Sequence, residues 1–109
     1  MEIEVLYFDG CPNHEALLPH LGRLLAKAGV EEDVFLRRVE SHEAAERERF
    51  LGSPTLRIDG HDVEPGAEQR MDFGLKCRLF ATADGPRGLP ADEWVLAALA
   101  RGDRSEGAP

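Results

Sequence analysis

Residues 3–20 read IEVLYFDGCPNHEALLPH and contain a change of hydrophobic period that decides the fold. Residues 3–8 are rich in β-branched and aromatic side chains and are followed by the turn sequence Asp9-Gly10, which predicts a short buried strand. After Cys11, leucines recur at three- and four-residue steps, which predicts a helix over 13–28 with one apolar face. The cysteine therefore lies at the junction between a strand and a helix.

The remaining chain continues to alternate between element types. The pattern predicts a strand at 33–40, a short charged helix at 41–50 with Ser41 as its N-cap, a strand at 54–59, a fourth strand at 76–80, a turn region at 83–88 and a helix at 90–102. This order predicts an α/β protein with a mixed four-stranded sheet and helices on both faces. The crossover through the first helix makes the first two strands parallel neighbours. We expect one domain over 1–102 and a flexible tail over 103–109.

Composition and charge exclude several classes of partner. The 109 residues include 21 acidic and 13 basic side chains, for a net charge of −8. Nucleic acids and anionic membranes bind through lysine and arginine, so neither is an expected partner. The sequence shows no secretory signal and no apolar run of about 18 residues, so we expect a cytoplasmic protein that binds small molecules or proteins. No cofactor is predicted.

The two cysteines, Cys11 and Cys77, are the candidate reactive groups. Cytoplasmic thiols are normally reduced, which favours reactive, metal-binding or buried cysteines over a permanent bridge. A helix N-terminus stabilises a thiolate at Cys11, and His14 lies one turn further on, where an imidazole can take the thiol proton. The alternatives are that both cysteines fill the core and that His14 faces solvent. A zinc site that also includes His61 matches no tight ligand spacing.

The first 60 residues resemble the thioredoxin superfamily. Cys11 follows the first strand, Pro12 opens the helix, and Pro19 lies inside it as the family's kinking proline does. The stretch FLGSPTLRIDG (50–60) is similar to the family's cis-proline loop and its following strand. The resemblance implies a thioredoxin-like fold, with a cis Ser53–Pro54 bond beside Cys11.

The helix of a dithiol oxidoreductase would begin Cys-x-x-Cys, whereas this chain has Cys11-Pro12-Asn13-His14. A disulfide-exchange role then requires Cys77 as the second, resolving thiol. By the same resemblance, Pro12, Ser53 and Pro54 would contact a substrate.

The stretch CRLFATADGPRGLPADEWVLAAL (77–99) resembles the catalytic domain of the alkylmercury lyase family. That resemblance implies two cysteines acting together, matched by Cys11 and Cys77, with His14 where the family has an aspartate. No part of the chain matches the family's N-terminal helical domain. Soft thiolates select soft metals such as mercury, and a nearby proton carrier, His14 or Asp9, would protonate the carbon released from an organomercurial.

Three functional classes follow, and enzymatic activity stays open among them. The first is a thiol protein related to the lyases, in which Cys11 and Cys77 bind soft metal or an organomercurial. The second is a redox protein that works through a Cys11–Cys77 disulfide or a mixed disulfide with a small thiol. The third is a non-catalytic thioredoxin-fold binding module. Both two-sulfur mechanisms require the cysteines to lie within reach of each other.

Overall fold

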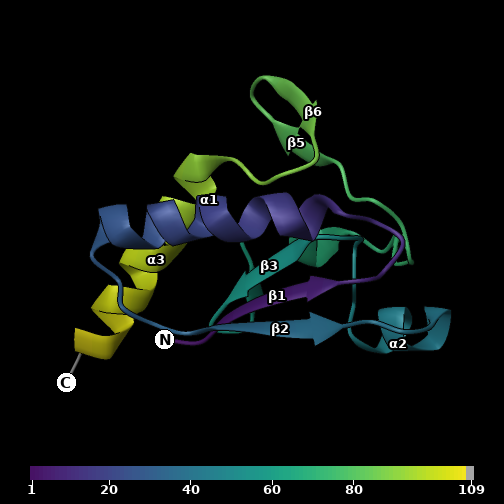
Figure 1. The fold of residues 1–109 in the computed structure, drawn as a ribbon, viewed down its shortest axis with the longest axis horizontal. Helices are drawn as coiled ribbons and strands as arrows, with labels where there is room; N and C mark the ends of the chain where they lie inside the picture. Colours follow the sequence, from purple (N-terminus) through teal and green to yellow (C-terminus); the bar gives the residue numbers. More distant parts are fainter. Residues whose placement is uncertain (108–109) are drawn as a thin grey trace.

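The computed structural model describes residues 1–107 and consists of a mixed sheet, three α-helices and a separate hairpin (Figure 1). The elements are β1 (Ile3–Tyr7), α1 (Asn13–Ala28), β2 (Val34–Arg38), α2 (His42–Arg47), β3 (Thr55–Ile58), β4 (His61–Asp62), the 3-10 helix η1 (Ala67–Gln69), β5 (Phe80–Thr82), β6 (Gly85–Arg87) and α3 (Asp92–Gly107). None of the helices over these residues is long and apolar enough to cross a membrane.

The four-stranded sheet has the order β2-β1-β3-β4. β1 and β2 are parallel and are connected through α1, whereas β3 is antiparallel to both β1 and β4. The predicted mixed α/β architecture is therefore confirmed, with β2 and β4 at the two edges of the sheet.

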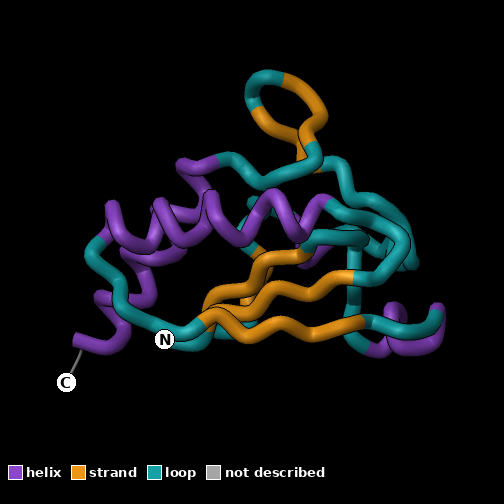
Figure 2. Tube along the Cα trace, viewed as in Figure 1, coloured by secondary structure: helices purple, strands orange, loops and turns teal. Residues whose placement is uncertain are grey.

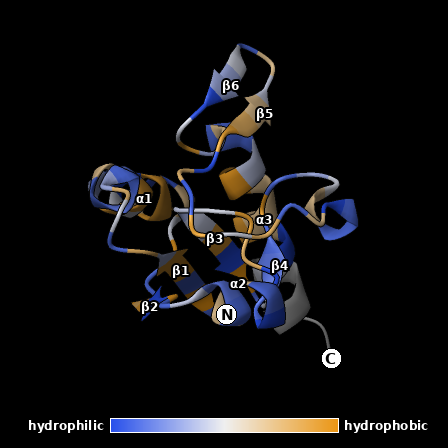
Figure 3. Ribbon diagram, turned by 90° about the vertical axis from the view of Figure 1, so that its right-hand side faces the viewer, coloured by the Kyte–Doolittle hydropathy of each residue, from blue (hydrophilic) through white to orange (hydrophobic). Residues whose placement is uncertain are grey.

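The two faces of the sheet differ in what covers them. Ile3 and Val5 of β1 belong to the main apolar core with leucines of α1 and with Val95 and Leu99 of α3. Figure 3 shows the matching pattern, with hydrophobic colour on the side of α1 that faces the sheet. Leu6 points to the opposite face because side chains alternate along a strand, and it packs in a smaller cluster with α2. Helices thus lie on both faces, as predicted.

Local signals explain where α1 ends and where α2 begins. Gly29 adopts φ 71° at the end of α1, where its N–H bonds back to the carbonyl of Ala26. Ser41 caps α2, as predicted, by accepting a hydrogen bond of 3.0 Å from the backbone N–H of Ala44. Helix α3 continues to Gly107 instead of ending at 102. Of the predicted flexible tail, residues 108 and 109 lie outside the described residues, and its flexibility stays a prediction.

The predicted fourth strand, 76–80, is wrong. The fourth strand of the sheet is instead β4, which follows β3 through a tight turn. Asp59 and Gly60 have φ of 53° and 82°, the pair of left-handed conformations found in a type I′ hairpin turn, and this turn brings β4 back along β3. Residues 76–79 make a single bridge, Ser53–Cys77. Phe80 then begins the β5–β6 hairpin, which occupies most of the predicted turn region.

Candidate functional site

The candidate site lies where β1 ends and α1 begins. Figure 2 shows that long loops gather at this end of the sheet. Cys11 and Cys77, 66 residues apart in sequence, meet here with their Cα atoms 5.5 Å apart and are joined by a disulfide. This separation is within the range of about 4.4–6.8 Å that a disulfide requires. The two cysteines therefore lie within reach of each other, as both two-sulfur hypotheses required, whereas whether the bridge is permanent or opens is not tested by this distance.

The two cysteines differ in exposure. The Cys11 residue is 0% exposed, whereas Cys77 is exposed to solvent. Cys11 is held inside by the turn that follows β1, in which its backbone N–H donates to the Phe8 carbonyl at 3.3 Å. Cys77 lies on an irregular segment at the surface. A molecule arriving from solvent therefore meets Cys77 first, although the helix position of Cys11 had suggested the opposite order.

The loop before β3 binds residues 76–78, here called the Cys77 segment, through backbone hydrogen bonds. The N–H of Ser53 donates to the carbonyl of Lys76 at 2.8 Å, and the carbonyl of Ser53 accepts from the N–H of Arg78 at 3.0 Å. Gly52, at φ 121°, permits this approach: a Cβ atom at that position would lie 3.0 Å from the Lys76 carbonyl oxygen. Cys77 is thus fixed between two backbone hydrogen bonds.

The Ser53–Pro54 peptide bond is cis, as predicted, and Ser53 lies against Cys11. The carbonyl oxygen of Ser53 is 3.6 Å from Cys11 Sγ. Both Ser53 and Pro54 are buried, whereas Pro12 is exposed. Of the three residues predicted to contact substrate, only Pro12 is therefore open to solvent. The hydroxyl oxygen of Ser53 is buried without a hydrogen-bond partner.

His14 is directed toward the backbone of Cys11. Its Nδ1 lies 3.1 Å from the carbonyl oxygen of Cys11, which requires a proton on Nδ1 because a carbonyl only accepts. The imidazole also stacks on Tyr7, with ring centroids 4.2 Å apart. These contacts orient the ring.

A charged cluster that was not predicted from the sequence anchors the Cys77 segment. Arg78 is 1% exposed and forms two hydrogen bonds with Asp62, at 2.7 and 2.9 Å, and one with Glu64, at 2.8 Å. It also donates to Thr55 at 3.0 Å, and its guanidinium lies 4.3 Å from the ring centroid of Phe80. A buried arginine needs such partners because burial of an unpaired charge is costly.

This cluster extends toward solvent through Arg70, which contacts Glu64 at 2.8 Å and Asp72 at 2.7 Å. Burial raises the pKa of Glu64, but hydrogen bonds from Arg78 and from the backbone N–H of Ala81 lower it, and the net pKa lies below its usual value. Hydrogen bonds from Arg70 and Lys76 hold the pKa of Asp72 well below its usual range. Both carboxylates are therefore ionised at neutral pH, as the ion pairs require.

One sequence signal was available for the cluster. Arg78 interrupts the apolar run of the predicted 76–80 strand, and an arginine in a buried strand must find acidic partners. Its acidic partners are Asp62 of β4 and Glu64 just after it, in a stretch for which no strand or helix was predicted.

Comparisons with known proteins assign no family to the chain. No family model matches it, and no match was found among curated proteins or solved structures.

Proposed function

We propose that this is a thioredoxin-like thiol protein that works by opening and closing the Cys11–Cys77 disulfide. The observation that carries the proposal is the pairing of one exposed cysteine, Cys77, with one buried cysteine, Cys11, at a Cα separation of 5.5 Å. The partner would be a small or protein thiol. In the cytoplasm, where we place the protein, disulfides are usually transient, which agrees with a pair that opens.

The arrangement supports a thiol–disulfide exchange in which each cysteine has one role. A substrate thiolate attacks Cys77 Sγ, the bond to Cys11 breaks, and Cys11 leaves as a thiolate. The second thiol of the substrate then displaces Cys77, so that the substrate becomes a disulfide and the protein a dithiol. Two electrons and two protons pass from substrate to protein. Cys11 precedes the first turn of α1, where the helix dipole favours its negative charge.

Three features support the finer assignment of a thioredoxin-like fold. β1 and β2 are parallel through α1, β3 returns antiparallel beside β1, and a cis-proline loop lies against Cys11. His14 replaces the second cysteine of the usual dithiol motif, and its Nδ1 contacts the carbonyl of Cys11. In this proposal His14 positions the Cys11 backbone, and Cys77 acts as the second thiol that the Cys-x-x-Cys motif would otherwise supply.

Two single-cysteine variants test the proposal. In Cys11→Ser, the exposed Cys77 has no partner and should accumulate a mixed disulfide with oxidised glutathione, detected by intact mass. In Cys77→Ser, the buried Cys11 should react at least about tenfold more slowly, because a thiolate must be accessible to react. Equal trapping on both variants, or faster trapping on Cys11, would contradict the assigned order.

The same pair supports a second function, the capture of soft metal, because two sulfur atoms converge on one point. This candidate keeps the proposed relation to the alkylmercury lyases. The reduced protein should bind one Hg(II) per chain, with a thiolate-to-mercury absorption that either Cys→Ser change removes. Neither His14 nor Asp9 has a contact with sulfur among the described residues, so cleavage of an organomercurial has less support than binding. Equal affinity after loss of Cys77 would overturn the paired-sulfur site.

A further inference from the structure

β2 is an edge strand with apolar side chains exposed to solvent. It pairs with β1 on one side, and no other described strand pairs with its second side. Phe35 is 57% exposed and Leu36 is 50% exposed, although they lie in the middle of the strand. In Figure 1, β2 forms the lower border of the sheet with no element beyond it. Such an edge presents free backbone groups that can pair with another strand.

The charges along this edge are arranged in two blocks of opposite sign. Residues 31–33 are acidic, 34–36 are apolar, and Arg37 and Arg38 are basic. The three acids are exposed, and none of them forms an ion pair within the described part of the chain. A segment with this order is complementary to itself when two copies run antiparallel.

The backbone fixes which alignments are possible. The N–H of Val39 donates to the carbonyl of Tyr7 at 2.8 Å, so Val39 bonds inward toward β1. Hydrogen-bonding direction alternates along a strand, and the backbone groups of Val34 and Leu36 therefore point away from β1. An antiparallel partner must bond to these outward groups.

We propose that β2 pairs antiparallel with β2 of a second copy of this chain, with Phe35 opposite Phe35. This alignment places Val34 opposite Leu36, Asp33 opposite Arg37 and Glu32 opposite Arg38 of the second copy. The outward backbone groups stay paired only if the alignment shifts by two residues at a time. A shift of two residues in one direction places Val34 opposite Arg38, and in the other direction it places Phe35 opposite Asp33, so both shifts break the match. Over residues 32–38, only the proposed alignment matches apolar with apolar residues and acid with base.

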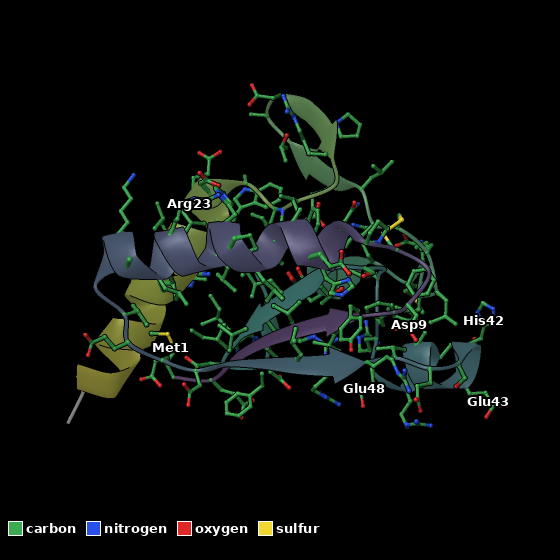
Figure 4. All side chains as sticks on the ribbon, in the orientation of Figure 1. Met1, Asp9, Arg23, His42, Glu43 and Glu48 are labelled. Atoms are coloured by element: carbon green, nitrogen blue, oxygen red, sulfur yellow. A yellow bond between two sulfur atoms is a disulfide. The ribbon has the colours of Figure 1, made fainter. Side chains whose placement is uncertain are left out.

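Arg37 and Arg38 can each pair with one more carboxylate, from Asp33 and Glu32 of the second copy. Arg37 already contacts Glu4 and Glu48, each at 3.0 Å, and Arg38 contacts Asp9 at 3.1 Å and also Glu40. Their side chains are still 42% and 49% exposed, and a guanidinium has five N–H donors. Arg37 and Arg38 are the last two residues of β2, and Figure 4 shows Asp9 and Glu48 near that end of the strand.

The proposed dimer has a defined geometry. The two four-stranded sheets would join into one continuous sheet about a two-fold axis at Phe35. Because the strands run antiparallel, the two Cys77 residues would lie at opposite ends and stay exposed. Dimerisation is therefore separable from the proposed thiol chemistry, and either can fail alone.

The first test measures mass by sedimentation equilibrium over a dilution series. The wild-type chain should reach twice its 12.0 kDa mass as concentration rises. The double change Glu32→Arg and Asp33→Arg sets like charges opposite Arg37 and Arg38 and should weaken dimerisation at least about tenfold. The double change Glu68→Arg and Asp84→Arg alters the net charge equally at exposed positions elsewhere and should leave the dimer intact.

A backbone variant gives an independent test. Leu36→Pro removes an N–H that points outward, which an edge strand tolerates, but this N–H would bond to the second copy. The variant should stay folded by circular dichroism and sediment as a monomer.

The alignment itself is tested by cross-linking. Opposite residues of a non-hydrogen-bonded pair have Cα atoms about 4.5 Å apart, within disulfide reach. Phe35→Cys should therefore form a covalent dimer under mild oxidant, whereas Leu36→Cys, which faces Val34, should form much less. A monomeric wild type at every concentration, a dimer unaffected by the Glu32 and Asp33 changes, or stronger cross-linking through position 36 would overturn the proposal.

Discussion

The β1–α1–β2 unit and the segment at 70–81 are stabilised by different kinds of interaction. The unit is held by a continuous strand ladder and by a core of leucines, valines and isoleucines. Before the β5–β6 hairpin begins at Phe80, the segment has one β-bridge, one disulfide and a cluster of ion pairs around Arg78. Ladder and core interactions are spread over many residues, whereas the segment depends on a few. Single changes should therefore have larger local effects in the segment.

The largest effect is expected for Arg78→Met. This change leaves Asp62 and Glu64 without their main cation in a buried site, and should lower the free energy of unfolding by about 3–5 kcal/mol. Chemical denaturation measures the loss. Arg87→Met, at an exposed arginine of the β5–β6 hairpin, is the matched control and should change stability by less than about 0.5 kcal/mol. Similar small effects for both variants would show that the cluster is not what anchors the segment.

Reduction of the disulfide should have the next largest effect on the free energy of unfolding. Opening a bridge between residues 66 apart frees a long loop in the unfolded chain and should cost about 2–4 kcal/mol. The reduced protein should keep its fold, because the Arg78 cluster still holds the segment. Denaturation with and without reductant measures the cost, and the variant with both cysteines changed to serine should match the reduced protein. Complete unfolding on reduction would contradict this account.

Acid should weaken the segment before it weakens the sheet. The pKa of Glu64 is lower in the folded protein than its ordinary 4.5. Its contribution to stability is therefore complete above that ordinary value and is lost as pH falls through the lower folded value. Glu64→Gln should be less stable than wild type at pH 7, and the difference should shrink in acid. Glu68→Gln, at an exposed position, should show no such pH dependence. A constant difference for Glu64→Gln would contradict the assignment.

The smallest effect is expected at the exposed end of the cluster. Lys76 contacts Asp72 at 2.8 Å, but the two side chains are 42% and 50% exposed. Lys76→Ala should change the free energy of unfolding by only about 0.2–0.5 kcal/mol, and the backbone bond from Ser53 to its carbonyl should persist. A loss above about 1 kcal/mol would mean that the ion pairs act as one network out to the surface.

The same contrast explains what the sequence could predict. The period of the leucines located α1, a β-branched run located β1, and the parallel crossover followed from their order. These elements are specified by residues close together in sequence. The short strand β4 was missed because its signal is the turn at Asp59-Gly60 rather than a run of apolar residues.

The site was predictable in part. Cys11, Cys77 and the Ser53–Pro54 loop do meet, as the two-sulfur hypotheses required. Their relative exposure was not predictable, because it depends on the turn after β1 and on the path of the 70–81 segment. The acidic partners of Arg78 could not be predicted from local sequence patterns either, because Glu64 and Asp62 are 14 and 16 residues away in sequence.

The central claim is that the Cys11–Cys77 disulfide opens and closes reversibly in the folded protein. Its most direct test is a redox titration in glutathione buffers, with the disulfide fraction measured by thiol trapping and mass and the fold followed by circular dichroism. The account predicts one reversible two-electron transition at a potential between about −180 and −320 mV, with the helical signal retained throughout. A disulfide that stays closed across this range, and is reduced only after unfolding, would make it a structural bridge and would contradict the proposed function.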